Sequence, residues 1–428
     1  MKQIKLKQKP NIAFLKYTLF FFVFVVGYNF LIVNQCNLWK TDYMTYSYHL
    51  VDFSFGFGSR LLPGAMYHLF FKEVLPGQLN AYLTVLMMAL FLAVAMVLSK
   101  LVLAQPTKSS RNSLFVLCLF LLAGPCTFAI FTKMLGIIDV YLVFFCAISL
   151  ALLSNKYLKY LLPLLFIGMV LVHTGALISY LLMFALIFFY EILKSEGAQK
   201  RGYIILAAFS FVMLAGFILF LSKYERSSLT YTMQEFNREL ERRNHFGSEV
   251  YTVYYDYYFY DTFEIQNFNF NQAKAVHLIS PDTSVLPRAL VEVINKYYSI
   301  IVLENRIYHD YPHFYWQFVL IFAVLAPILF VYYSYWFKKA KQAKGWLKLF
   351  YIAVMLQFPV SMLGCFFSAD ISRFYTHAFL AQSTLFLYVL YKEKDVFEIK
   401  LEKKGFMHFI LLIVYFAVYA LTYVDPYQ

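Results

Sequence analysis

The chain has 428 residues, of which 61% are hydrophobic and only 14% are charged. A soluble protein of this length needs far more charge to cover its surface, so these values exclude an ordinary soluble domain. Apolar runs of about 20 residues alternate with short basic segments, which predicts a polytopic helical membrane protein. The formal net charge of +13 does not indicate nucleic acid, because most of the excess Lys and Arg lies in short loops beside the apolar runs.

The N-terminal region predicts a retained first span with the N-terminus inside. Residues 1–16 carry five lysines and no acid, and the apolar run 17–33 lacks a small-residue cleavage site. Residues 34–79 are then expected outside. The apolar stretch Leu61–Leu75 within them is too short to cross a bilayer, so we expect an outer re-entrant or interfacial segment near 51–77.

The later apolar runs predict further helices of alternating direction. The expected spans are 80–104, 113–131, 137–154, 160–192 (two elements that meet at His173), 203–221, 314–336, 349–367, 374–391 and 406–423. Gly124-Pro125 should kink the span 113–131. Lysines cluster at each inward turn, so the expected fold is an all-α, polytopic transmembrane helical bundle of about eleven spans, with the N-terminus inside and the C-terminus outside.

Three parts follow from this pattern. Residues 1–222 form the N-terminal transmembrane bundle, residues 223–313 form one large extracytoplasmic loop, and residues 314–428 form the C-terminal transmembrane helices. Within the loop, Thr232-Met233-Gln234-Glu235 matches a capping box, which predicts a short helix through Arg243.

Ionisable residues that interrupt or border apolar segments are the candidate site residues, because charge in a membrane is costly. They are Asp52, Arg60, Asp139, His173, Asp370 and Arg373. A purely structural interpretation is also open. Arg373 can pair with Asp370 or reach lipid headgroups, and Asp139 can be an acid at a helix N-terminus, where the helix dipole stabilises it. All six fall at the expected outer ends of spans or in outer turns, which favours a shared outward-facing polar cavity.

Arginines and acids in one cavity suit a phosphate-linked sugar. A guanidinium matches phosphate and pyrophosphate with bidentate hydrogen bonds, and a nearby acid or histidine can take a proton from an attacking sugar hydroxyl. This set favours a lipid-pyrophosphate-linked glycan as substrate. No metal or cofactor is expected, since the sequence has no metal-ligand cluster, P-loop or dinucleotide glycine pattern, and its five cysteines show no paired spacing.

Four segments carry a resemblance. They are Asp52–Gly64 with its Gly-Phe-Gly-Ser-Arg core, Gly136-Ile137-Ile138-Asp139, His173 after a short half-span, and Ala369-Asp370-Ile371-Ser372-Arg373-Phe374. Together with the topology they resemble the bacterial surface-polysaccharide polymerases, the Wzy-type and EpsG-like integral membrane proteins. Where that family more usually has Gly-Arg-x-Asp and His-Glu, this chain has Gly136-Ile137-Ile138-Asp139 and His173-Thr174.

The resemblance implies an enzyme of the cytoplasmic (inner) membrane that polymerises lipid-linked repeat units into O-antigen, capsule or exopolysaccharide at its outer face. Arg60 and Arg373 would hold pyrophosphate. His173 or Asp139 would be the catalytic base, and Asp52 and Asp370 would orient the arginines. The implied partners are an undecaprenyl-pyrophosphate-linked oligosaccharide, membrane lipid and a chain-length regulator, without nucleic acid, metal or cofactor.

Two other classes stay open. A multispan glycosyltransferase with a lipid-phosphate sugar donor would use acids of the first outer loop, Asp42 and Asp52, as base and metal ligands. A flippase or transporter of lipid-linked glycan would need charge along a path through the membrane. The inner halves of the expected spans carry almost none, which argues against transport.

Overall fold

The fold is all-helical. The computed structural model describes residues 12–33, 41, 43–55, 61–124, 127, 131, 139–153, 155–173, 177–224, 233–245, 313–362 and 371–397. Every regular element in these ranges is a helix, and one isolated bridge pairs Val74 with Asn244. The predicted all-α class is therefore confirmed for the described part of the chain.

Four of the described helical segments are long and apolar enough to cross a membrane. They are Ile12–Leu31, Pro76–Ala104, Gly197–Leu221 and Gly345–Met362. About 20 apolar residues suffice to cross a hydrocarbon core of about 30 Å, so these segments indicate a membrane protein. The predicted last span, 406–423, lies outside the described residues.

The chain divides into two compact units, which interleave along the sequence. The first comprises Met1–Lys40, Asn80–Leu135 and Ser383–Gln428. In it α1 (Ile12–Tyr28) continues into a π-helical turn, Asn29–Val33, and packs on α5 (Lys108–Ala123). The ring of Phe115 lies 5.2 Å from that of Phe21, an aromatic contact that fixes this pair of apolar helices.

The sequence sets both ends of α5. Thr107 and Ser110 form a capping box, in which each side chain accepts a hydrogen bond from the other residue's backbone N–H. The helix ends at Ala123, with Gly124 in an extended conformation as its C-cap. The expected kink at Gly124-Pro125 is thus a helix end, because a residue before proline is driven out of the helical region.

The second unit comprises Thr41–Leu79 and Gly136–Gln382. Its helices are α2 (Tyr43–Leu50), α3 (Leu62–His68), α7 (Asp139–Leu153), α8 (Leu162–Val172), α9 (Leu177–Lys194), α10 (Gly197–Tyr224), α11 (Met233–Arg243), α15 (His313–Gln342), α16 (Gly345–Met362) and the start of α17 (Ile371–Glu393). Short 3-10 turns cover Phe53–Phe55 and Leu158–Leu161. Helix α4 (Pro76–Ala104) begins in this unit and continues in the first.

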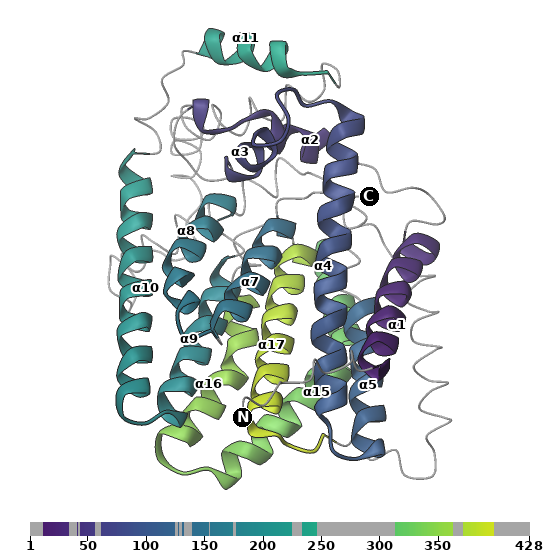
Figure 1. Cartoon of the computed structure of the whole chain (residues 1–428), viewed down its shortest axis with the longest axis vertical. Coiled ribbons are helices and arrows are strands. Elements are labelled where there is room, and N and C mark those ends of the chain that lie inside the picture. Colours follow the sequence, from purple (N-terminus) through teal and green to yellow (C-terminus); the bar gives the residue numbers. More distant parts are fainter. Residues whose placement is uncertain are drawn as a thin grey trace, which may run out of the picture. The chain divides into compact units, whose positions relative to one another are not determined.

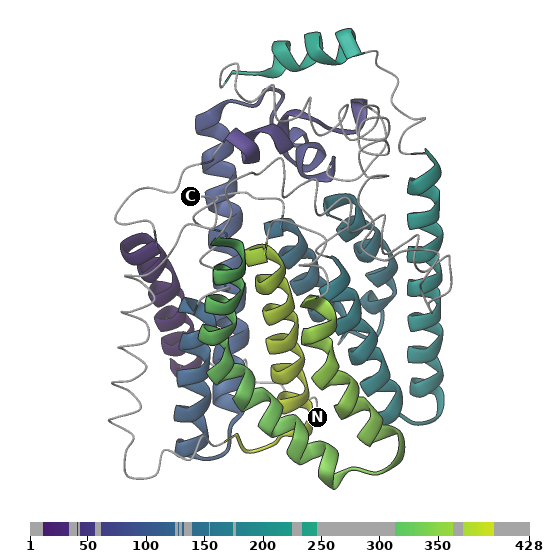
Figure 2. The ribbon, with the colours of Figure 1, turned by 180° about the vertical axis from the view of Figure 1, so that it is seen from behind.

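Long apolar helices of the second unit pack side by side (Figure 1). Helix α8 packs on α7 and α10, α9 packs on α10 and α16, and α16 packs on α15. The ring of Phe379 in α17 lies 6.3 Å from that of Tyr332, which places α17 beside α15 (Figure 2). Helix α8 ends at Val172, and His173 is its extended C-cap. The predicted break at His173 is therefore confirmed.

The segment near 51–77, which the sequence predicts to be re-entrant or interfacial, contains helices too short to cross a membrane. Pro63 occupies the first turn of α3, where its missing N–H costs no hydrogen bond. Gly64 follows, and a Cβ there would overlap the carbonyl oxygen of Val51. Only glycine lets the backbone of α3 come this close to the Val51 carbonyl, so Gly64 allows α3 to pack against the chain that follows α2.

Candidate functional site

Two of the predicted site residues meet inside the second unit. Asp139, the first residue of α7, is fully buried, and Arg373, in the first turn of α17, is nearly so. Arg373 Nε donates a hydrogen bond of 2.6 Å to Asp139 Oδ2. Helix α17 begins before the expected span 374–391, so Arg373 is helical rather than part of a turn. Each charge compensates the other in an apolar interior where neither is tolerated alone.

His377 lies against the same carboxylate. It is one helical turn beyond Arg373, so the two side chains share a face of α17. Its Nε2 is 3.4 Å from Asp139 Oδ1, and its Nδ1 is 2.8 Å from the hydroxyl of Tyr180 in α9. With a neutral ring that presents N–H to the carboxylate, Nδ1 is an acceptor and Tyr180 donates to it.

His173 belongs to the same region. It is 8% exposed at the C-terminal end of α8, and it is close enough to Asp139 to act on it electrostatically. Helices α7, α8, α9 and α17 thus each bring a polar residue to one place. The resulting group, Asp139, His173, Tyr180, Arg373 and His377, is called the buried polar cluster below.

A second group of charges joins α11 to residues 43–75, which the sequence predicts to lie outside and which are called the first outer segment here. Arg243 donates to Asp52 Oδ2 (3.1 Å), to the carbonyl of Leu50 (3.2 Å) and to Ser54 Oγ (3.0 Å). Its Nε also donates to Glu239 across 2.8 Å, one turn earlier in the same helix. These contacts, together with His68 Nε2 at 3.7 Å from Asp52, are called the outer clasp.

The two carboxylates of the outer clasp are held ionised. Burial tends to raise the pKa of Asp52, but hydrogen bonds from Ser54 and the charges of Arg243 and His68 outweigh burial and lower it. A hydrogen bond from Arg242 is the main cause that lowers the pKa of Glu239 to about 2. Both carboxylates therefore carry charge well below neutral pH.

Backbone contacts extend the same junction. Val74 forms a bridge with Asn244, and the backbone N–H of His245 donates to the Tyr46 hydroxyl across 3.1 Å. The Tyr46 hydroxyl in turn donates to the carbonyl of Val74. The short helix through Arg243 that the sequence predicts is confirmed, and it docks on the first outer segment.

His49 connects that outer segment to α7. Its Nδ1 faces the Thr45 carbonyl at 2.7 Å, and its Nε2 is 2.9 Å from the hydroxyl of Tyr141. Tyr141 is two residues from Asp139. Burial is the main cause that lowers the pKa of His49 to about 4, with a smaller contribution from the neighbouring His68, so this ring is neutral at neutral pH.

The other predicted residues stand as follows. Asp52 is paired with Arg243, which sequence reasoning did not select. Arg60, Asp370 and the rival candidate Asp42 lie outside the described residues. Among the residues that the structure describes, no group of three or more His, Cys, Asp and Glu is placed to hold a metal ion.

Sequence reasoning also missed two members of the buried polar cluster, His377 and Tyr180. The signal for His377 was available, since it is an ionisable residue four positions after Arg373 in an otherwise largely apolar helix. Tyr180 carried no signal, because 37 tyrosines occur in the chain.

No protein-family model, curated protein or solved structure matches this chain. The fold and the buried polar cluster are therefore what describe the kind of protein this is. It is an all-helical protein with helices able to cross a membrane, and it holds a carboxylate, a guanidinium and two imidazoles together among apolar helices.

Proposed function

We propose that this protein is a membrane-embedded glycosyltransferase that polymerises lipid-linked oligosaccharide repeat units into a surface polysaccharide. The observation that carries the proposal is the pairing of Arg373 with Asp139 beside His377 and His173. Burying an ionisable group in a membrane protein costs free energy, so such a group is by default a candidate functional residue. A guanidinium in such a place suits the pyrophosphate of a lipid-linked glycan.

The reaction is a displacement at the anomeric carbon of the growing chain. A hydroxyl of the incoming repeat unit attacks that carbon and loses its proton to a base. The bond from the carbon to the pyrophosphate oxygen breaks, and the lipid pyrophosphate leaves with the electron pair. Preorganised positive charge at the leaving group lowers the barrier of such a step.

We assign these proposed roles to residues of the buried polar cluster and its surroundings. Arg373 supplies positive charge to the leaving pyrophosphate, with Arg60 as its proposed second donor, and Asp139 orients Arg373 through Nε. His173 is the proposed base, since it borders the cluster at the end of a helix. Asp52 organises the outer clasp rather than an arginine of the buried polar cluster. Asp370 remains a proposed partner of the arginines.

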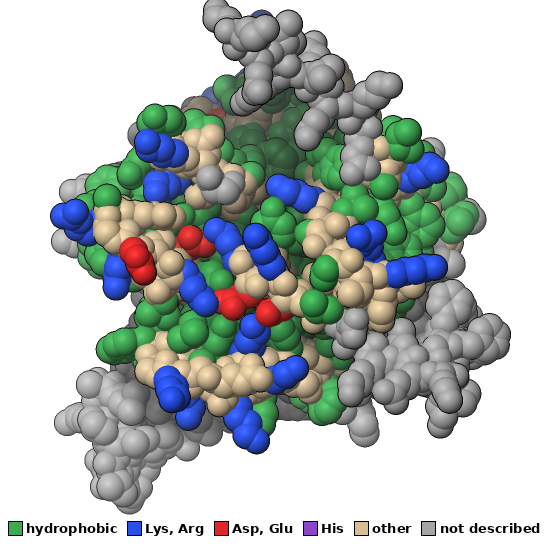
Figure 3. All heavy atoms as spheres, turned by 60° about the horizontal axis from the view of Figure 1, so that its bottom comes forward, with side chains coloured by type: hydrophobic (Ala, Val, Ile, Leu, Met, Phe, Trp, Pro, Cys, Tyr) green, Lys and Arg blue, Asp and Glu red, His purple; other side chains and the backbone are tan. Residues whose placement is uncertain are grey.

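The proposed setting is the cytoplasmic membrane, with about eleven spans, the N-terminus inside and the buried polar cluster toward the outer face. Several Lys and Arg side chains lie on the face that Figure 3 shows, and the positive-inside rule would make such a face cytoplasmic. The substrate would be an undecaprenyl-pyrophosphate-linked oligosaccharide in that membrane, and a chain-length regulator is a proposed partner.

The test is the surface glycan profile of cells that carry Arg373→Lys or Asp139→Asn in place of the natural chain. We expect long chains to disappear while single lipid-linked repeat units persist. Lysine keeps the charge but lacks the planar pair of donors, so it should not restore chain length. The matched control is Arg201→Lys, an exposed arginine of α10, with protein level measured by immunoblot.

Two outcomes would replace the proposal. Loss of the completed single unit, with Asp42→Ala equally inactive, would indicate a monosaccharide transferase with a lipid-phosphate donor. Complete repeat units that accumulate only on the inner face would indicate a flippase. Normal glycan in both cluster variants would remove the catalytic role of the cluster.

A further inference from the structure

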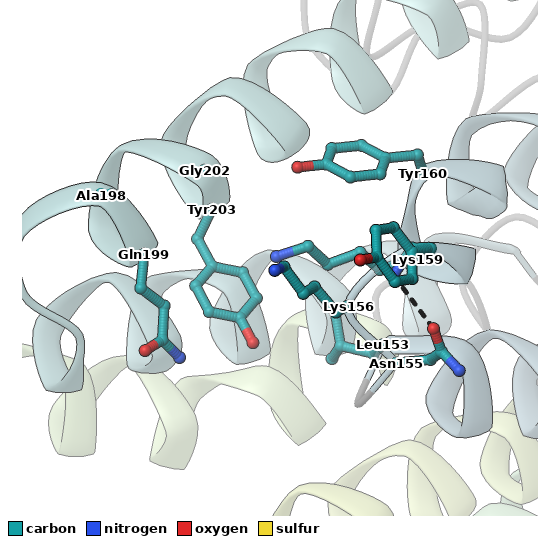
Figure 4. Close-up of a pocket in the computed structure, with 10 residues that line it drawn as sticks. Leu153, Asn155, Lys156, Lys159, Tyr160, Ala198, Gln199, Gly202 and Tyr203 are labelled. Atoms are coloured by element: carbon teal, nitrogen blue, oxygen red, sulfur yellow. Dashed lines mark hydrogen bonds between the residues drawn. The ribbon is translucent and has the colours of Figure 1, made fainter.

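A cavity of about 540 Å³ lies where α7 turns into α8 (Figure 4). The residues of its wall that matter here are Asn155, Lys156, Lys159, Tyr160, Gln199 and Tyr203. They come from the turn after α7 and from the first two turns of α10.

This cavity is separate from the buried polar cluster. Leu153, the last residue of α7, lines it, whereas Asp139 is the first residue of that helix. Fifteen residues at a rise of about 1.5 Å make α7 roughly 22 Å long. The cavity thus lies at the opposite end of the helix, among the basic turns of the second unit.

Two ammonium groups extend into the cavity. Lys159 Nζ lies 4.5 Å from the centre of the Tyr203 ring and 5.6 Å from that of Tyr160 (Figure 4). These rings hold the amine across the cavity by cation–π attraction. Lys156 extends in the same direction in this view. Asn155 Oδ1 accepts from the backbone N–H of Tyr157 and of Leu158, which fixes the turn that presents both lysines.

The carboxylate of Glu191 lies near the lysines and interacts with Tyr203, whose ring face contacts the Lys159 amine. Against the buried carboxylate of Glu191 stand the two lysines of the wall, and the cavity favours an anion. Lysines are compact, strongly hydrated point charges that bind phosphate without requiring one orientation.

The surface beside the cavity is apolar. Leu161 and Leu164 are 44% and 62% exposed, and Tyr160 exposes more than half of its surface. Tyr160 and Leu164 are four residues apart and lie on one side of the chain. A ligand with its phosphate at the lysines would place an attached acyl chain along these side chains.

We propose that this cavity binds a phosphate group, carried by an anionic membrane lipid whose chains lie against Leu161 and Leu164. Basic pockets between helix ends are typical sites for anionic headgroups. The inference does not depend on the glycosyltransferase activity, since it concerns the other end of α7.

The test uses the full-length protein in nanodiscs of phosphatidylcholine with phosphatidylglycerol, and native mass spectrometry of the lipid that it retains. We expect Lys156→Gln with Lys159→Gln to lower retained phosphatidylglycerol by roughly tenfold or more. The control, Lys341→Gln with Lys344→Gln, removes the same charge at the end of α15 and just after it, and should leave lipid retention unchanged. Equal retention in the first variant and the natural protein, or equal loss in both variants, would overturn the proposal.

A third variant separates a shaped site from general attraction. A Cβ at Gly202 would meet only Lys159 Nζ, at 4.0 Å, so Gly202→Leu fits the helix and fills the cavity while both charges remain. It should release the lipid; unchanged retention would show that shape plays no part and would refute the site.

Competition with inorganic phosphate distinguishes a lipid headgroup from a free anion as the source of the bound phosphate group. Displacement of the lipid by inorganic phosphate, only in protein with both lysines, supports the same phosphate site with a free anion as an alternative ligand.

Discussion

Asp139 and Arg373 lie 234 positions apart in the sequence, and their side chains form a 2.6 Å hydrogen bond in the interior of the helical bundle. The bond ties the start of α7 to the start of α17. A buried pair of this kind fixes the relative position of two helices, because any shift would separate opposite charges in an apolar medium.

Removal of one member of this pair should destabilise the protein strongly. We expect Asp139→Asn to cost roughly 3–5 kcal/mol, since Arg373 then keeps a buried charge without its carboxylate. Asp139→Asn with Arg373→Gln should recover much of the loss. The melting temperatures of the purified single and double variants measure this coupling, and losses that simply add would contradict it.

Tyr180→Phe isolates the hydrogen bond to His377. The ring stays in place while the hydroxyl that contacts Nδ1 disappears, so His377 loses a hydrogen-bond partner that helps to fix its tautomer. One hydrogen bond is worth about 0.5–1.5 kcal/mol, so chain extension should fall roughly 2- to 10-fold with folding intact. Rates of glycan elongation in isolated membranes are the measurement. Tyr190→Phe, a buried tyrosine later in α9, is the control.

Arg243 and Arg242 offer a matched comparison of neighbours. Arg243 contacts Asp52, Ser54 and Leu50 across the outer clasp, whereas the side chain of Arg242 is 70% exposed and bonds Glu239 in its own helix. Arg243→Gln should weaken docking of α11 by about 1–3 kcal/mol. Faster proteolysis at α11 in this variant, but not in Arg242→Gln, is the expected result.

Equal cleavage of the two arginine variants would mean that Arg243 contributes no more than an exposed residue. Asp52→Asn provides an independent check, because it removes the other half of the same ion pair. It should resemble Arg243→Gln, and adding both changes should cost little more than either one alone.

His49 should make the fold sensitive to mild acid. The unfolded imidazole takes up a proton near pH 6.5, but burial lowers the pKa of the folded ring to about 4. The contribution of His49 is therefore full above pH 6.5 and is lost as the pH falls toward 4. A difference of this size corresponds to about 3 kcal/mol.

The measurement is the melting temperature between pH 7 and pH 4. His49→Gln should flatten the profile in this window, because the titrating group is gone. His245→Gln, which replaces a half-exposed histidine at the end of α11, should leave the acid sensitivity as it is. An unchanged slope in His49→Gln would assign the acid sensitivity to other groups.

Gly64 should not tolerate a methyl group. Its Cβ would overlap the Val51 carbonyl oxygen, which belongs to the backbone and cannot rotate away. Gly64→Ala should displace α3 and lower the melting temperature by several degrees. Gly77→Ala is the control, since a Cβ there meets nothing within 4 Å. A stable Gly64→Ala protein would show that the approach of α3 to this carbonyl is adjustable.

The sequence predicted the helical class and part of the site for physical reasons. Apolar periodicity and length locate helices, and an acid or arginine beside an apolar run is conspicuous, so Asp139 and Arg373 were both selected. Their pairing was not foreseen, because contact between α7 and α17 depends on packing. The partner of Asp52 was missed for the same reason: Arg243 is 191 residues away.

Helix α8 is 11 residues long, about 16 Å at 1.5 Å per residue, which is about half of a hydrocarbon core of about 30 Å. Its end at His173 therefore cannot reach the far headgroups if its start lies at the near ones. On the proposed function, a lipid pyrophosphate would meet its reaction partners below the headgroup plane. The pyrophosphate of the carrier would then have to leave the headgroup plane and enter the protein interior in each round of transfer.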